Sequence, residues 1–171
     1  QGLKIFCEYR DKRSFPLLLP LLDQSCPVER MSAVYALGRN PCPDAVNKLV
    51  SLLESDDNAY VRRATAWSLA NYDNQIVLGP LIKALQNDVS SVRLWASSSL
   101  AEIGSISNDN AQLAADQLLI SLKIDNEPVV RSNCIWSLCR LYQMLSNKLQ
   151  ESFIDECTKI ALFDSEPSVM E

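Results

Sequence analysis

Apolar residues recur every three or four positions in four segments of the chain that align with one another without gaps. These segments cover residues 29–38, 61–70, 92–101 and 130–139, and a fifth copy begins at Val169. In each complete copy the ninth residue is leucine and the fifth is Ala, Thr or Cys, and this spacing of four places both side chains on one face of a helix. The segments therefore predict four equivalent helices, here called the B helices.

A second set of apolar residues at helical spacing lies between these copies and predicts their partner helices, here called the A helices. They are expected at residues 15–22, 44–53, 76–85, 111–122 and 149–163, and residues 3–9 read as the tail of an earlier one. Acidic or polar turns, such as 56–58, 87–88 and 125–128, precede the B helices and are expected to supply their N-caps.

The starts of the copies at 29, 61, 92, 130 and 169 give a period of 31 to 39 residues, which is typical of stacked helix pairs. The predicted fold class is all-α: a right-handed α-solenoid of HEAT-type antiparallel helix pairs, forming a single domain over residues 1–171. Each pair would bury its apolar face against its neighbours. Because the fifth copy is interrupted, we expect the chain to be an excerpt of a longer protein.

An arginine stands seven residues before the repeat leucine in every copy, at Arg30, Arg62, Arg93 and Arg131. Aspartates occupy the turn before each one, at 23, 56 or 57, 88 and 125. We interpret these residues as a ladder of Arg–Asp pairs that ties the turns of adjacent repeats together. Such pairs add specificity more reliably than net stability, so the ladder is assigned a structural role.

Composition narrows the classes of partner. The 171 residues carry a formal net charge of -5, and no dense run of Lys and Arg appears, so nucleic-acid binding is not expected. No apolar segment approaches the roughly 20 residues needed to cross a bilayer, so a membrane is not expected either.

The sequence contains no residues arranged for catalysis. Histidine is absent, which removes the usual general base and triad member, and no glycine-rich loop is present to hold a phosphate. The acidic pairs at 56–57 and 155–156 read as caps or solvated charges. No catalytic residue and no resident cofactor are expected, and an enzyme is the less favoured interpretation.

The six cysteines divide by position. Cys134 and Cys139 take the place of small residues in other copies and are expected in the core, with Cys7 and Cys157 on helices. Cys26 and Cys42 lie beside prolines in loops, about 16 Å apart along one helix, too far for a disulfide. No metal site is expected, and a reduced cytoplasmic protein is the simplest interpretation.

Aromatic and arginine side chains form the strongest candidate binding surface. Tyr35, Trp67 and Trp136 share one repeat position, where the remaining copy has Ser98, and Trp95 lies one turn earlier on its helix. Trp, Tyr and Arg are enriched at the energetic centres of protein interfaces. The alternative is that the rings fill gaps between repeats. The candidate partner-binding residues are Tyr35, Arg39, Tyr60, Arg63, Trp67, Trp95, Trp136 and Arg140.

The repeat texture, with Val-Arg-x-x-Ala followed by Trp-Ser/Ala-Leu, resembles the phycobilisome (PBS) lyase HEAT-like repeats of cyanobacteria. The segments 26–28 (CPV), 36–41 (ALGRNP), 43–46 (PDAV), 92–100 (VRLWASSSL) and 130–134 (VRSNC) resemble, more narrowly, the cyanobacterial IscA-interacting HEAT-repeat proteins. The resemblance covers residues 15–142. Glu29 and Asn71-Tyr72 depart from the repeat pattern.

The two resemblances imply different functions. The narrower one implies a non-catalytic scaffold that binds an A-type iron–sulfur carrier protein. The broader one implies a bilin lyase, isomerase or chaperone subunit acting on phycobiliproteins, with a bilin as transient ligand. A bilin site needs aromatic walls, basic groups for the propionates and a carboxylate near the pyrrole nitrogens. The aromatic and arginine residues meet part of that requirement, and the sequence does not identify the carboxylate.

Overall fold

The computed structural model describes residues 11–163, 166 and 169, and every regular element in this part of the chain is helical. The expectations for residues 3–9, for Cys7 and for most of the fifth copy fall outside the described residues. The described B helices are α3 (Pro27–Arg39), α5 (Ala59–Leu69), α7 (Ser90–Gly104) and α9 (Pro128–Leu141). The predicted all-α fold class is confirmed.

The A helices begin in most repeats with a short 3-10 turn. They comprise η1 (Lys12–Ser14) with α2 (Phe15–Leu18) and η2 (Leu19–Asp23), η3 (Pro43–Ala45) with α4 (Val46–Ser55), η4 (Gln75–Val77) with α6 (Leu78–Asn87), α8 (Asn108–Ile124), and, after η5 (Tyr142–Met144), α10 (Asn147–Phe163). Pro20 lacks a backbone N–H, so the first A helix cannot continue as one α-helix and changes to a 3-10 turn at Leu19.

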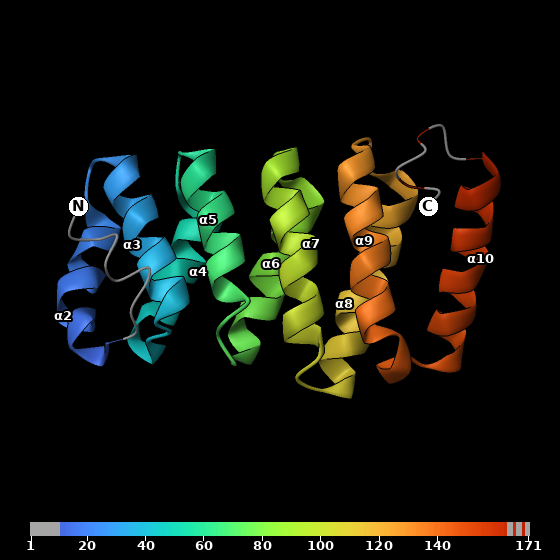
Figure 1. Ribbon diagram of the computed structural model, residues 1–171, viewed down its shortest axis with the longest axis horizontal. Coiled ribbons are helices and arrows are strands. Elements are labelled where there is room, and N and C mark those ends of the chain that lie inside the picture. The colour runs from blue at the N-terminus through green and yellow to red at the C-terminus, as the bar shows by residue number, and fades with distance from the viewer. Residues whose placement is uncertain (1–10, 164–165, 167–168, 170–171) are drawn as a thin grey trace.

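The helices form two layers. The B helices stand side by side in chain order, with α4, α6 and α8 behind them (Figure 1), and each B helix packs against the next one. The A helices α4, α6, α8 and α10 contact one another in the same order. This arrangement is an α-solenoid, in which each repeat contacts its sequence neighbours.

The core lies between the two layers. The repeat leucines Leu37, Leu69, Leu100 and Leu138 are fully buried, as are the residues four positions before them, Ala33, Thr65, Ala96 and Cys134. Full burial of a leucine contributes about 1.5–3 kcal/mol, and the small partner residues let the B helices approach closely. The periodicity that predicted the B helices therefore marks the face that each helix buries.

The Arg–Asp ladder is present, and three of its arginines, Arg30, Arg62 and Arg93, pair with the aspartate of the following turn. Arg30 binds Asp56 through its Nε and Nη2 atoms at 2.7 and 2.8 Å. The equivalent pairs are Arg62–Asp88 and Arg93–Asp125, with bonds of 2.7–2.8 Å. The Nη1 atom of each arginine donates to a backbone carbonyl of its own preceding turn, so one guanidinium joins two successive turns.

The ladder also organises the turns themselves. Asp56 accepts from the backbone N–H of Asn58 at 2.9 Å, and Asp125 accepts from that of Glu127 at 3.0 Å. Of the acidic turns expected to cap helices, only the one at 56–58 supplies an N-cap side chain, because Asn58 accepts from the N–H of Tyr60 at 2.9 Å. Asp23 lies outside the ladder and pairs with Lys48.

Electrostatics lower the pKa of two ladder aspartates, Asp56 and Asp125. Burial alone would raise the pKa of Asp56, but the hydrogen bonds from Arg30 and from the N–H of Asn58 bring the pKa of this carboxyl below its usual value. The pKa of Asp125 is lowered in the same way, against its burial, by Arg93 and by the N–H of Glu127.

A buried serine precedes the repeat leucine on three B helices, and two of these serines link neighbouring repeats. The hydroxyl of Ser99 donates to the carbonyl of Ala66 at 2.8 Å, and that of Ser137 donates to the carbonyl of Ser97 at 2.9 Å. The hydroxyl of Ser68 is equally buried and has no hydrogen-bond partner.

Tyr72, which departs from the repeat pattern, fixes the turn after α3. Its side chain is buried, its hydroxyl donates to the carbonyl of Leu37 at 3.1 Å, and it accepts from the N–H of Cys42 at 3.4 Å. Burial raises the pKa of Tyr72 to about 12, so the phenol stays protonated and can donate.

The cysteine predictions are confirmed in part. Cys134 is fully buried, whereas Cys139 is exposed on α9, so its assignment to the core is wrong. Cys139 takes the repeat position of the buried Ala101, but among the described elements no B helix follows α9 to cover this side of it. Cys26 and Cys42 are free as expected, with Cys26 exposed and Cys42 buried.

Candidate binding surface

Tyr35, Trp67, Trp95 and Trp136 line two hollows whose residues come only from the B helices and the turn after α5. Trp95 and Trp136 are 38% and 48% exposed, whereas Tyr35 and Trp67 are partly buried. Of the two alternatives, filling a gap between repeats therefore applies to some of these rings and an exposed binding surface to others. Tyr35 and Trp67 fill the gap between α3 and α5, with ring centroids 5.4 Å apart, and Trp95 and Trp136 present their rings to solvent.

A first hollow of about 380 Å³ is lined by Tyr35, Arg39, Trp67 and Trp95. The guanidinium carbon of Arg39 lies 5.5 Å from the ring centroid of Trp67, within the range of a cation–π interaction. Arg39 is exposed and makes no ion pair with any residue in the described part of the chain.

A second hollow of about 310 Å³ adjoins the first and shares Trp67 and Trp95 with it. Its lining is completed by Ala70, Asn71, Ser98, Ser99, Glu102 and Trp136. Arg140 lies over the ring of Trp136, 5.0 Å from its centroid, and pairs with Glu102 at 2.5 Å. The two hollows together are called the tryptophan groove, because they bring together all 3 tryptophans of the chain.

The groove depends on close packing beneath it. A Cβ atom added to Gly38 would lie 2.6 Å from Cζ3 of Trp67, so only glycine at this position lets the indole settle against α3. On the other side, the amide of Asn133 donates to the hydroxyls of Ser97 and Ser98, both at 2.7 Å, and ties α9 to α7 beside the second hollow.

Three of the eight predicted residues line neither hollow: Arg140, which lies over the ring of Trp136, and the pair Tyr60 and Arg63. Tyr60 and Arg63 form their own cation–π pair at 5.3 Å on the first turns of α5 and line neither hollow. The Nε atom of Arg63 is buried without a hydrogen-bond partner. Tyr60 lies seven residues before Trp67 on α5, so two helical turns separate these residues by about 10 Å along the helix axis.

Sequence reasoning missed three polar residues of the groove, Asn71, Ser99 and Glu102. Glu102 lies seven residues after Trp95, so the same two-turn spacing could have placed it on this face. Its pairing with Arg140 crosses from α7 to α9, and no sequence pattern signals that contact.

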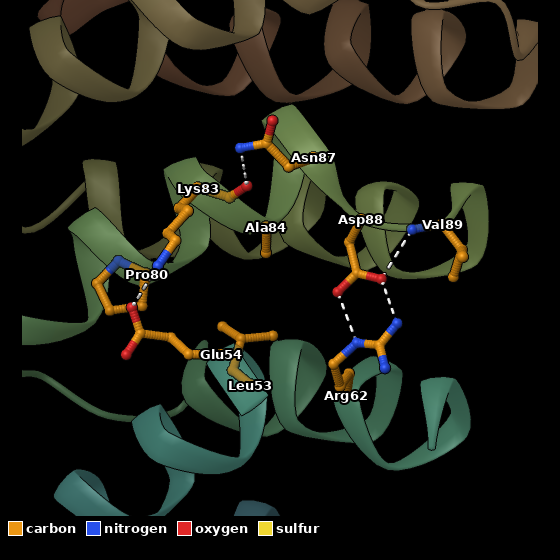
Figure 2. A pocket seen from close by; sticks show the side chains of 9 residues that line it. All are labelled: Leu53, Glu54, Arg62, Pro80, Lys83, Ala84, Asn87, Asp88 and Val89. Carbon is orange, nitrogen blue, oxygen red and sulfur yellow. Dashed lines mark hydrogen bonds and ion pairs between the residues drawn. The ribbon is translucent and has the colours of Figure 1, made fainter. Parts of the chain in front are cut away.

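Further hollows lie on the side of the A helices, next to the Arg–Asp ladder. Figure 2 shows one of about 290 Å³, where Arg62 pairs with Asp88 and Lys83 reaches Glu54 at 3.3 Å. An equivalent hollow, about 370 Å³ in volume, lies one repeat later beside Arg93 and Asp125. The charged groups that line the hollow in Figure 2 are paired with one another, so we assign it to the joints between repeats.

Metal ligands do not gather in the described part of the chain, since no three His, Cys, Asp or Glu side chains there lie together. Within the same residues no helix is both long enough and apolar enough to cross a membrane.

Stacked antiparallel helix pairs with an aligned repeat define a helical-repeat solenoid. Residues 2–70 and 46–139 match the HEAT repeats family, and the chain belongs to this family. In three dimensions it is similar to a chain of the complex of CpcE and CpcF of phycocyanin lyase from Nostoc sp. PCC7120. That chain is 22% identical, the match covers 93% of the present chain and 95% of the other, and the TM-score is 0.68. At this identity the likeness shows a shared fold. No curated protein matches the sequence.

Proposed function

We propose that this chain is a non-catalytic scaffold that binds another protein through the tryptophan groove on its B helices. A solenoid presents a long, regular surface of neighbouring helices, and many repeat proteins bind their partners on such a surface. The proposal gives the groove the role of the contact region and leaves the Arg–Asp ladder to hold the repeats in register.

One observation carries the proposal: all 3 tryptophans of the chain line one groove, and two of them are 38% and 48% exposed. Tryptophan and arginine are the side chains most enriched at the energetic centres of interfaces, and a ring left in water gains much free energy when a partner covers it. Arg39 and Arg140 lie against these rings at 5.5 and 5.0 Å.

The test replaces both Trp95 and Trp136 with Ala and measures capture of partner proteins from cells of the source organism. We expect a loss of binding of at least about 2 kcal/mol, the cost of removing an interface anchor, with circular dichroism unchanged because both rings are exposed. The matched control replaces Ile120 and Ile124, which are exposed on α8 in the other layer, and should bind as the wild type does. Equal losses in both variants would contradict the proposal.

An A-type iron–sulfur carrier protein is the partner implied by the narrower family resemblance. The acidic chain, with no gathered metal ligands in its described part, supports binding of the carrier protein rather than of its cluster. Titration of purified carrier into the chain, followed by tryptophan fluorescence, tests this assignment. A carrier that leaves the emission of the three tryptophans unchanged removes it as the occupant of the groove.

The second candidate function is a bilin lyase, isomerase or chaperone subunit. The specific observation in its favour is Glu102, a carboxylate set among Trp67, Trp95 and Trp136, together with the two groove arginines. These groups match the requirements of an open-chain tetrapyrrole, and the likeness in fold to a chain of the CpcE–CpcF complex agrees with it. Mixing the chain with phycocyanobilin and an apo-phycobiliprotein tests it: an unchanged visible spectrum and no covalent adduct would eliminate this function.

A further inference from the structure

The two hollows of the tryptophan groove repeat at the spacing of the helices beneath them. The first is built by α3, α5 and α7, and the second by α5, α7 and α9, so they are displaced by one helix. Packed helices lie about 8–10 Å apart. A polyproline II segment repeats every three residues, over roughly 9 Å. Residues i and i+3 of such a segment therefore match successive hollows.

The hydrogen-bonding groups of the groove distinguish an extended segment from a helix. Within the described residues, none of the indole N–H groups of Trp67, Trp95 and Trp136 donates to another protein group. A polyproline II segment has no internal hydrogen bonds, so its carbonyls are free to accept from such donors. A bound α-helix has its carbonyls engaged internally, except in its last turn, and cannot use them.

The charges at the two ends of the groove are unequal. At the α9 end Arg140 and Glu102 neutralise each other, whereas at the α3 end the exposed Arg39 has no carboxylate partner in the described part of the chain. The groove thus carries a local positive charge on a chain whose formal net charge is -5. A complementary ligand carries a carboxylate where it meets α3.

From the spacing, the free donors and the charge we propose that the groove binds an extended, proline-containing segment of the partner protein. The segment adopts the polyproline II conformation, places residues i and i+3 in the two hollows, and carries Asp or Glu beside Arg39. This inference rests on the proposed scaffold function and names the chemistry of its partner. Aromatic-lined grooves elsewhere bind such segments because the polyproline II conformation is preformed and loses little entropy on binding.

The experiment uses the intrinsic fluorescence of the full chain, since all of its tryptophans line the groove. The probes are pools of 10-residue peptides with proline at every third position. Each peptide carries two Glu residues at one of its ends, and the pools include both placements. Matched pools keep the composition but place the prolines side by side, or replace Glu with Lys. We expect a saturable change in emission with the first pool and about tenfold weaker binding with each matched pool, equal to about 1.4 kcal/mol.

Two variants test whether Arg39 is the positive charge that binds the carboxylate of the peptide. Arg39→Gln should weaken binding of the Glu-containing pool about fivefold and strengthen binding of the Lys-containing pool, while Lys83→Gln on the other layer should change neither. Equal binding of the register-matched and side-by-side pools, preference for Lys, or no saturable change with any pool would each overturn the inference. If no pool binds while capture of a partner still depends on Trp95 and Trp136, the scaffold function stands and only the polyproline assignment fails.

Discussion

At the scale of single residues, the serine before the repeat leucine shows how one position serves two purposes. Ser99 and Ser137 each donate to a carbonyl of the preceding B helix, so a small side chain both permits close packing and joins two helices. Ser68 stands at the equivalent position with its hydroxyl buried and unpaired. A buried hydroxyl without a partner costs free energy, whereas a satisfied one contributes about 1 kcal/mol.

We therefore predict opposite outcomes for the same substitution at two equivalent sites. Ser99→Ala should lower the free energy of unfolding by about 1–2 kcal/mol, because it leaves the carbonyl of Ala66 without its donor. Ser68→Ala should leave stability unchanged or raise it slightly, since it removes an unpaired polar atom. Urea denaturation of both variants measures the difference, and equal losses would show that the Ser68 hydroxyl is satisfied in solution.

At the scale of elements, the Arg–Asp ladder makes the packing of successive repeats depend on pH. The pKa values of Asp56 and Asp125 are lowered, so their contribution to stability is complete above the unfolded-state value near 3.9. It is lost as pH falls below about 4 toward the native pKa values, because protonation then removes the partners of Arg30 and Arg93. The ladder joins helices that are distant in sequence, so its loss loosens the stack.

The corresponding measurement is the urea midpoint between pH 7 and pH 2.5. The urea midpoint of the wild type should fall steeply below about pH 4. The double variant Asp56→Asn, Asp125→Asn should have a lower midpoint at pH 7, and its midpoint should change less with pH. Asp109→Asn, in the first turn of α8 and outside the ladder, is the control and should follow the wild-type profile. Parallel slopes for wild type and the double variant would show that other carboxyls govern the acid transition.

The elements also show what sequence can and cannot predict here. The spacing of Leu37, Leu69 and their equivalents predicted the B helices, because this face must be buried against the neighbouring helices. The arginines were correctly assigned to the ladder, but their pairing with the following turn depends on how far a guanidinium reaches between repeats. The same limit applies to Glu102 and Arg140, which meet across two helices, and to Cys139, whose exposure depends on how α9 packs and not on its repeat position.

At the scale of the whole molecule, stability depends on how many neighbours each repeat has. Helices α5 and α7 each pack between two B helices, whereas α3 has one B neighbour in the described part of the chain. In a linear array the terminal units open first and the central ones last. We predict that backbone amides of α5 and α7 exchange most slowly with deuterium, by at least about tenfold relative to those of α2 and α10, as measured by mass spectrometry. Uniform protection would instead indicate opening of the whole stack as one unit.

The position of the ladder has a mechanical consequence for the groove. The bidentate pairs bind the N-terminal ends of the B helices, so the stack is stiff along that edge. At the opposite edge Tyr72 braces α3 against α5, and the Glu102–Arg140 pair braces α7 against α9. Between α5 and α7, the bond from the hydroxyl of Ser99 to the carbonyl of Ala66 is a single neutral hydrogen bond. A single neutral hydrogen bond restrains a joint less than a charged pair does, so we expect bending of the solenoid to widen the groove first between Trp67 and Trp95.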